Sequence, residues 1–418
     1  MTLAAARPQL PFTRPNLLDL APFYEVLRRE APIAPVTTPA GDPAWLATRF
    51  AEVRQLLGDK RFGRSHPEPE QAARISLAGI QDGPSGSYDS EATEHARMRR
   101  LLTPAFSAKR MRALSGHVQE LVDGYVDRML AEHESSGGGQ VDLHAHLAFP
   151  LPVAVICKLL GVPEADGEYF RSLSDRMATY SGQDAHDAQI EFSRYMAGLA
   201  ETKRAEPGED VITDLVRAQA DEEDFGYEEL VRICVGLLFA GHETTVNRIG
   251  LGTLFLMTRR DQWDSLAADP DGRIDAVVEE MMRMGAPGDL GLLRYAHEDV
   301  EIGGATIERG DAVILSINAA NRDETVFSDA EDFDPDRTER GHIGFGHGPH
   351  FCIGASLART ELRAVFTTWP AASHGCGWPS GWTSWTSVPT TSPAASAACR
   401  SSGEGTSKRA EPHRHVVR

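Results

Sequence analysis

The chain has 418 residues, 41% of them hydrophobic, and a formal net charge of −19 at pH 7. This length and apolar content suffice for the core of one large domain. The negative charge argues against general binding to nucleic acid or to an anionic membrane, because their phosphate groups would repel it. The chain contains no long apolar run, and its first residues lack the basic and apolar blocks of a signal peptide. We therefore expect a cytoplasmic monomer with no nucleic-acid or membrane partner.

In chain order, hydrophobic spacing predicts mostly helix. Helical patterns over 22–32 and 51–59 flank a predicted hairpin around the turn at Gly41, and residues 61–91 form a long loop rich in Pro, Gly and Ser. Further helices are expected over 97–132, 148–160, 165–180, 188–204, 210–220, 227–260 and 271–285, followed by a strand–turn–strand pattern over 300–316. The segment 227–260 is apolar on nearly every side, which predicts a helix through the middle of the protein. The fold class is mainly α with a small β-rich lobe.

The longest predicted helix contains the stretch AGHETT at residues 240–245. A glycine inside a helix costs about 1 kcal/mol relative to alanine, and Thr244 can bond back to the carbonyl one turn earlier. Together Gly241 and Thr244 favour a local bulge, beside which Glu243 and Thr244 would line a groove for a ligand. The alternative is an ordinary polar patch on a packed helix. HETTV does not match HExxH, which excludes the usual zinc-protease motif.

Two further motifs predict an ionic network. Glu280 and Arg283 of EMMR have the i, i+3 spacing of a helical ion pair. Arg337 of DFDPDR lies shortly before a glycine-rich loop and could complete a partly buried network with them. A glutamate between two guanidinium groups would be held by bidentate hydrogen bonds.

That loop, IGFGHGPHFCIG, contains Cys352, one of five cysteines whose irregular spacing indicates reduced thiols. A zinc site with His342, His347 and His350 is one interpretation, but the spacing fits no standard structural-zinc pattern. A simple buried cysteine would not need glycines around it. Glycines instead let the backbone approach a flat ligand and direct amides at the sulfur, and a helix beginning near Ala355 adds its positive end. These features predict a stabilised thiolate. The glycines concerned are Gly346, Gly348 and Gly354.

The sequence resembles the cytochrome P450 family. FGHGPHFCIG resembles its haem-binding signature, AGHETT its central-helix oxygen-binding motif, EMMR its Glu-x-x-Arg motif and DFDPDR its arginine segment. The four motifs occur in the family's order between about Tyr24 and Phe366. The resemblance is strongest to bacterial members of actinobacterial type that tailor macrolides and other natural products. It implies the P450 fold, described above as mainly α with a small β-rich lobe.

The resemblance also implies a role for each motif residue. Cys352 would be the axial thiolate ligand of haem b (iron protoporphyrin IX), with Phe345 packed near the sulfur in the loop that includes Gly346 and Gly354. Glu243 and Thr244 would relay protons through ordered water, and Gly241, next to Ala240, would leave room for oxygen. The haem propionates would be bound by His95, Arg99, Arg294 and His350.

Members of this family receive electrons from a ferredoxin. The ferredoxin is reduced in turn by a ferredoxin reductase that takes its electrons from NAD(P)H. The basic run, defined as residues 95–112, carries six Lys or Arg and no acid. It would suit an acidic partner, helped by Arg359 and Arg363, although a solvated helix face is the plainer interpretation. The implied function is a monooxygenase that hydroxylates or epoxidises a lipophilic natural product such as a macrolide. The alternative is a haem-thiolate protein without oxygenase activity, either peroxide-dependent or catalytically silent.

The resemblance covers residues 1–366 as one catalytic domain and stops there. Residues 367–418 contain no Leu, Ile, Phe or Met, yet hold four of the six tryptophans. A natural disordered tail is one interpretation. A frameshift explains more, because 37 Arg against five Lys indicate a gene rich in G and C. Shifting the frame by one base forces apolar residues at spacings of four and three and then two, which continue a helix and then a strand. The positions are 369, 373, 376, 378, 380, 382, 385 and 387.

Overall fold

The computed structural model describes residues 7–75, 83–137, 141–178, 183–285, 288 and 290–373. The helices are α1 (Phe23–Glu30), α2 (Phe50–Gly58), α3 (Glu91–Leu102), α4 (Ala108–Ser135), α5 (Pro150–Leu160), α6 (Gly167–Ala178), α7 (Gln183–Ala205), α8 (Val211–Asp221), α9 (Tyr227–Met257), α10 (Arg260–Ala268), α11 (Pro270–Met284), α12 (Ile317–Ala320) and α13 (Ala355–Ser373). A π-helical turn (His144–Ala148) precedes α5, and short 3-10 turns span Glu164–Asp166 and Gly348–His350.

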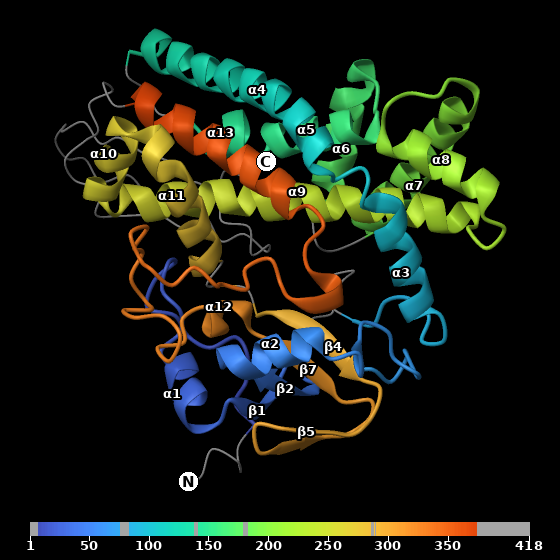
Figure 1. Ribbon diagram of the computed structural model, residues 1–418, viewed down its shortest axis with the longest axis vertical. Coiled ribbons are helices and arrows are strands. Elements are labelled where there is room, and N and C mark those ends of the chain that lie inside the picture. The colour runs from blue at the N-terminus through green and yellow to red at the C-terminus, as the bar shows by residue number, and fades with distance from the viewer. Residues whose placement is uncertain are drawn as a thin grey trace, which may run out of the picture.

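The strands form a five-stranded sheet in the order β1-β2-β7-β4-β3 and a separate β5-β6 hairpin. Their bounds are β1 (Ile33–Thr37), β2 (Pro43–Ala47), β3 (Phe62–Gly63), β4 (Leu292–Ala296), β5 (Val300–Ile302), β6 (Ala305–Ile307) and β7 (Ala312–Leu315). Among the strands of the described residues, β2 and β7 form the one parallel pair. The sheet lies with α1 and α2 in the lower part of Figure 1, below the helical part.

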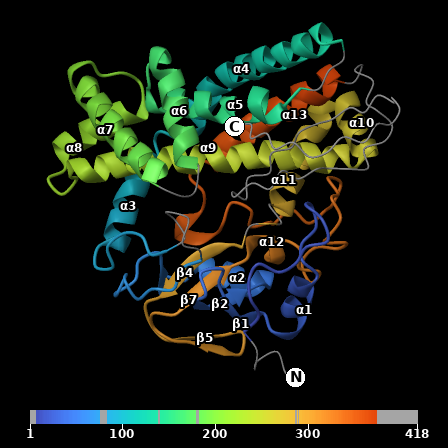
Figure 2. The same cartoon turned by 180° about the vertical axis from the view of Figure 1, so that it is seen from behind.

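Helix α9 crosses the middle of the helical part, and Figures 1 and 2 show it between helices on both sides. Its buried residues belong to the largest hydrophobic cluster, which also includes residues of α4, α5, α11 and α13. The prediction of a central helix is therefore confirmed. The predicted hairpin is confirmed too, because β1 pairs antiparallel with β2 and Gly41 adopts a φ of +95° in the turn between them.

Several predicted boundaries were wrong. The helix expected over 97–132 is divided into α3 and α4, because Pro104 disfavours helix at Thr103. Helix α10 was not predicted, since its inward face consists of little more than Trp263 and Leu266. Strand β4 was also missed. Four of its five residues are buried, so no alternation of polar and apolar residues marks it.

Helix α13 continues beyond the predicted domain end at Phe366 and passes through Pro370 to Ser373. The frameshift interpretation predicts that this helix ends near Pro370, and the described helix runs about one turn further, to Ser373. Pro370 is buried, and Trp369 packs against the main hydrophobic cluster. This burial offsets the helical hydrogen bond that proline cannot donate. Residues 374–418 lie outside the described residues. Within the described ranges, no helix combines the length and apolarity that a membrane crossing requires.

Candidate active site

The loop before α13 holds Cys352 in a fixed place. The Cys352 amide donates to the carbonyl oxygen of Phe345 at 2.9 Å, which closes the loop on itself. Gly346 and Gly348 have φ values of +75° and +71°, a region that residues with a Cβ avoid. A Cβ on Gly348 would also lie 2.8 Å from the carbonyl oxygen of Leu57. Gly354 has no such conflict, because its Cβ would lie 3.9 Å from the cysteine sulfur.

The protein alone does not stabilise the Cys352 thiolate. Solvent reaches the side chain, yet the atoms packed around the sulfur raise the pKa of the thiol above its usual value. The Gly354 amide and the charges of Arg99 and Arg359 act in the opposite direction and only reduce this rise. The prediction of a stabilised thiolate therefore stays a prediction for the protein with a bound cation. A bound metal cation would supply the missing stabilisation, because a coordinated thiol is deprotonated.

Four predicted propionate ligands come from three separate elements and lie near one another. His95 and Arg99 are on α3, Arg294 is on β4, and His350 ends the 3-10 turn before the cysteine. The rings of His95 and His350 are 3.9 Å apart. Burial and then the charges of His95 and Arg294 lower the pKa of His350 to about 3. Burial and Arg64 lower the pKa of Arg294 to about 10.

This His95 cluster, defined as His95, Arg99, Arg294 and His350 with Arg64, has an excess of positive charge. Among the described residues, no carboxylate forms an ion pair with Arg294, whose Nη1 donates to the Leu293 carbonyl oxygen at 2.7 Å. Arg294 is nevertheless only 8% exposed. A buried cation without a counter-ion is costly, and two carboxylates would neutralise it. The donor set therefore fits the two propionates of a haem whose iron Cys352 would bind.

Arg64 and Glu91 belong to this region but were not predicted. Glu91 accepts hydrogen bonds from the amides of Arg64 at 2.7 Å and Ser65 at 2.9 Å, and from the Ser65 hydroxyl. These bonds outweigh its burial and keep the pKa of Glu91 below its usual value. Glu91 thus fastens the start of α3 to the loop that contains Arg64. Neither residue stands in a recognisable motif, so the sequence offered no signal.

The AGHETT face of α9 has a different geometry from the predicted one. The helix is continuous over Tyr227–Met257, so the expected bulge is absent there, although Thr244 Oγ1 does donate to the Ala240 carbonyl oxygen at 2.8 Å. A single bond of this kind does not break a helix that is packed on several sides. A Cβ on Gly241 would lie 3.2 Å from Ile156 Cδ1 of α5. Gly241 therefore permits close helix packing, and its role of leaving room for oxygen stays a prediction.

The other AGHETT side chains differ in exposure. Ala240 and Thr244 are exposed, and Glu243 is half-buried. His242 is 6% exposed, its Nε2 has no hydrogen-bond partner, and its ring lies 4.6 Å from that of Phe149. Burial, with a smaller contribution from His144, lowers the pKa of His242 to about 4. The sequence motif gave no reason to expect a buried, neutral histidine at position 242.

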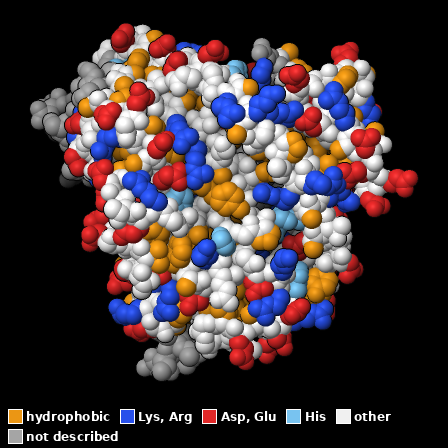
Figure 3. Space-filling view, viewed as in Figure 1, with side chains coloured by type: hydrophobic (Ala, Val, Ile, Leu, Met, Phe, Trp, Pro, Cys, Tyr) orange, Lys and Arg blue, Asp and Glu red, His pale blue; other side chains and the backbone are white. Residues whose placement is uncertain are grey.

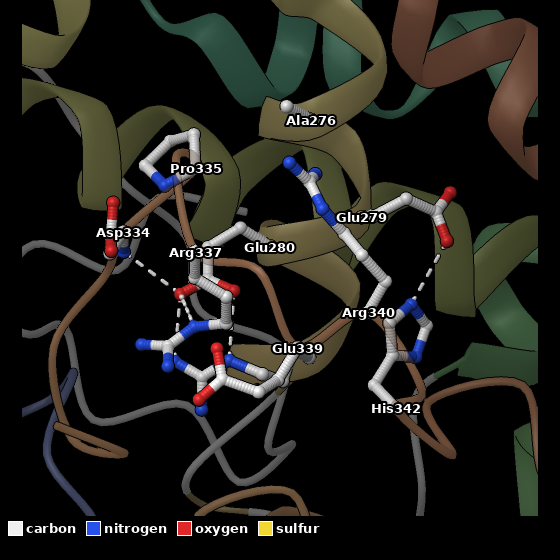
Figure 4. Close-up of a pocket in the computed structure, with 10 residues that line it drawn as sticks. Ala276, Glu279, Glu280, Asp334, Pro335, Arg337, Glu339, Arg340 and His342 are labelled. Carbon is white, nitrogen blue, oxygen red and sulfur yellow. Dashed lines mark hydrogen bonds and ion pairs between the residues drawn. The ribbon is translucent and has the colours of Figure 1, made fainter. Parts of the chain in front are cut away.

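The predicted ionic network is assembled and buried. Arg283 donates to Glu280 through Nε at 2.8 Å and Nη2 at 2.7 Å, and Arg337 Nε donates to the same carboxylate at 3.2 Å. Their side chains are at most 4% exposed. A small pocket beside them is lined by polar groups of α11 and the segment 334–342, most of which are already bonded to one another (Figure 4). We therefore assign this pocket to the network and not to a substrate.

Half of the six cations of the basic run are neutralised by carboxylates. Arg97, Arg100 and Arg110 pair with Glu229, Glu222 and Asp214, each at 2.7 Å. Arg99 donates to the Phe351 carbonyl oxygen at 2.9 Å, and Lys109 and Arg112 are exposed. Figure 3 shows Lys and Arg side chains on either side of a central hydrophobic patch on this face. The sequence could not reveal the pairing, because the carboxylates come from segments more than 100 residues away.

Comparisons with known proteins agree with the motifs. The chain matches the family model for Cytochrome P450 over residues 273–369. It is 41% identical over 371 residues to pentalenolactone synthase of Streptomyces exfoliatus, covering 86% of this chain and 90% of the relative. It is 38% identical over 369 residues to mycinamicin IV hydroxylase/epoxidase of Micromonospora griseorubida, covering 87% and 90%.

Solved structures share the fold. The putative thioether synthase SgvP, involved in the tailoring step of griseoviridin, gives a TM-score of 0.80 at 34% identity and covers 89% of this chain and 93% of that one. The substrate-free cytochrome P450 PimD, a polyene macrolide antibiotic pimaricin epoxidase, gives 0.77 at 38% identity, covering 86% and 92%. The predicted fold class is confirmed. With relatives at this identity over nine-tenths of their length, the chain belongs to the cytochrome P450 family.

Proposed function

We propose that this P450 is a ferredoxin-dependent monooxygenase that hydroxylates or epoxidises a lipophilic natural product of macrolide type. The observation that carries the proposal is the His95 cluster, an excess of positive charge around the buried Arg294, whose last member, His350, lies two residues before Cys352. Because the family binds haem, the two haem propionates are the anions that would match this charge. Pentalenolactone synthase and mycinamicin IV hydroxylase/epoxidase are both named for natural products, which supports the substrate class.

Membership of the family implies a haem-iron cofactor, and we assign it as haem b. Cys352 would bind the iron through its sulfur, and His95, Arg99, Arg294 and His350 would hold the propionates. When bound, the haem iron supplies the activation of dioxygen and the transfer of one oxygen atom to the substrate. Phe345, Gly346 and Gly354 keep the loop compact enough for a flat group to approach.

Two side chains of α9 would handle protons. The Thr244 hydroxyl donates its own proton to the Ala240 carbonyl oxygen at 2.8 Å, so its oxygen remains an acceptor for a hydrogen bond from water. Glu243, half-buried beside it, would exchange protons with that water. The Thr244 hydroxyl would thus hold a water molecule in place, and the Glu243 carboxylate would return a proton to that water after it has given one up.

P450s of this bacterial type use redox partners, and we propose a ferredoxin fed by an NAD(P)H-dependent reductase. Its docking would depend on Lys109 and Arg112 more than on the remainder of the basic run. Arg97, Arg100 and Arg110 already bond carboxylates of this chain, so a partner would have to compete for them. An acidic partner would therefore be steered by few charges.

The deciding experiment supplies ferredoxin, reductase, NADPH and ¹⁸O₂ to the holoenzyme with macrolides that shift its absorption spectrum. We expect product containing one ¹⁸O atom. Thr244→Ala should keep haem and substrate binding but divert NADPH electrons to hydrogen peroxide. Thr253→Ala is the matched control, because Thr253 makes the same bond to Ile249 on the same helix at 2.9 Å. Product formed with hydrogen peroxide and none with ferredoxin would favour the alternative, a haem-thiolate protein without oxygenase activity.

We also propose that residues after about Thr368 are translated out of frame and that the catalytic domain continues in the shifted frame. The support is the apolar spacing that the shifted codons force, together with the helix that runs across residue 366. Resequencing the coding DNA and measuring the intact mass of the native protein test this. Clean DNA, a mass matching 418 residues and full activity would contradict it.

A further inference from the structure

A second ionic group joins α11 to α13 outside the Glu280 network. Glu279 accepts hydrogen bonds from Arg359 Nε at 2.6 Å and Nη2 at 2.8 Å. His342 Nε2 lies 3.1 Å from the same carboxylate, as Figure 4 shows. Burial raises the pKa of Glu279, but the bonds from Arg359 and His342 prevail and lower it to about 2. The carboxylate is thus ionised and holds the guanidinium in one orientation.

That orientation places Arg359 against the cysteine loop. The guanidinium carbon lies 4.3 Å from the centre of the Phe345 ring, which is within the range of a cation–π contact. The carbonyl oxygen of Phe345 accepts the hydrogen bond from the Cys352 amide. The charge of Arg359 is also one of two cations that act on the Cys352 sulfur. A continuous set of contacts therefore runs from Glu279 through Arg359 and Phe345 to the cysteine.

This geometry changes the role expected for Arg359. The sequence suggested a docking cation, but two of its nitrogens bond Glu279, and its side chain is 26% exposed. Its planar guanidinium stacks on a ring while it makes two parallel bonds, which lysine cannot do. The side chain is therefore better suited to hold the loop than to meet a partner.

The same two helices carry a natural control. Asp275 and Arg363, one turn along each helix, also form an ion pair at 2.6 Å. Their side chains are 73% and 44% exposed, against 25% and 26% for Glu279 and Arg359. Any effect that comes only from tying α11 to α13 should appear in both pairs. An effect on the cysteine should appear in one.

We propose that Glu279 is a positioning residue, which holds Arg359 over Phe345 and thereby keeps a positive charge beside the Cys352 sulfur. The proposal rests on the proposed function, because it takes Cys352 as the ligand of the haem iron. It goes beyond that function because it makes Glu279, a residue of α11, one of the groups that set the reduction potential of the haem iron. Without Glu279, the Arg359 side chain gains freedom and turns toward water, so the sulfur loses a neighbouring cation.

The test is the midpoint reduction potential of the holoenzyme. Loss of a cation near the sulfur makes the thiolate a stronger donor and lowers the potential, so both Glu279→Gln and Arg359→Gln should lower it. A direct effect of the lost carboxylate charge would raise the potential in Glu279→Gln instead. The double variant should match Arg359→Gln, because Glu279 acts through Arg359. Asp275→Asn and Arg363→Gln should leave the potential unchanged.

A raised potential in Glu279→Gln, or an equal change in Asp275→Asn, would overturn the proposal. Arg359→Lys covers the case in which Glu279→Gln does not fold, since lysine keeps the charge but loses the paired bonds and the stacking. It should lower the potential, though by less than Arg359→Gln, because the charge is kept but no longer held over Phe345, and a wild-type value would overturn the idea. A wild-type carbon monoxide spectrum without thiolate ligation would reject the proposed function itself. A normal wild-type carbon monoxide spectrum, together with an unchanged reduction potential in Glu279→Gln, would reject only the positioning role of Glu279.

Discussion

Two groups of cations, each with at least one buried arginine, lie in the described part of this protein, and they differ in their balance of charge. In the Glu280 network, Arg283 and Arg337 surround one carboxylate and also donate to backbone carbonyls, so their donors are satisfied within the chain. In the His95 cluster, burial and then the neighbouring positive charges lower the pKa values of His95, Arg294 and His350, and Glu91 is the carboxylate that opposes this shift. The first group needs nothing from outside, whereas the second lacks negative charge.

The difference indicates how a ligand site can be separated from a structural network of the same residue types. Buried arginines in both groups look alike in sequence and in exposure. Only the second group would become more stable when an anion binds, because its desolvation cost has no compensation within the chain. The following experiments break one group at a time.

Glu280→Gln should have the largest effect, because it leaves two buried guanidinium groups without their counter-ion. We expect a loss of roughly 3–5 kcal/mol in the free energy of unfolding. Urea unfolding of the holoenzyme, followed by circular dichroism, measures it. Asp336→Asn is the control, since Asp336 is 67% exposed in its pair with Arg273 and should cost less than about 1 kcal/mol. Equal losses would show that the balanced network is not what stabilises this region.

His242 tests whether a buried polar atom without a partner is enough to mark a ligand site. Its folded-state pKa of about 4 lies below the ordinary 6.5, so the neutral form is favoured. Its stability contribution is therefore present above pH 6.5 and is lost as the pH falls toward 4. From the size of this shift we expect a loss of up to about 3 kcal/mol.

His242→Phe should remove this part of the acid sensitivity and leave haem binding unchanged. Urea unfolding of wild type and variant between pH 7 and 4.5 measures the difference in slope. Weakened haem binding in the variant would instead place His242 with the ligand-binding cations.

Arg294→Gln should affect haem and not the fold. Charge-assisted hydrogen bonds contribute about 1.5–3 kcal/mol, so haem should dissociate roughly ten- to a hundredfold faster. Transfer of haem to an excess of apomyoglobin measures the rate. Arg309→Gln serves as the control on the surface of the same lobe. An unchanged rate for Arg294→Gln would mean that the unbalanced charge has another cause.

Reversal of two exposed cations should have the smallest effect. Lys109→Glu with Arg112→Glu should slow reduction by ferredoxin several-fold at low salt, because both side chains are exposed and neither forms an ion pair with another described residue. Above about 0.1 M salt the difference should fade through screening. Stopped-flow reduction measures it, with Arg260→Glu, a residue of α10, as control. The same slowing at all salt concentrations would argue against steering by charge.

The sequence alone determined the central helix, the loop around Cys352 and the partners of Glu280. Each is encoded locally: by apolar spacing, by glycines at positions that need a left-handed backbone, and by an i, i+3 pair. The pattern of motifs also indicated the family before any contact was known. The local signal at Gly241 did not reveal that its missing Cβ also permits packing against Ile156 of another helix.

Only the tertiary structure decided which charges remain without a partner. Arg97 and Arg110 found carboxylates on distant helices, Arg359 turned inward to Glu279, and Arg64 joined the His95 cluster from a loop. An ion pair between segments far apart in the chain leaves no periodic pattern and no motif. Its formation depends on the packing of whole helices, which brings the charges within a few ångströms of each other and removes the water between them.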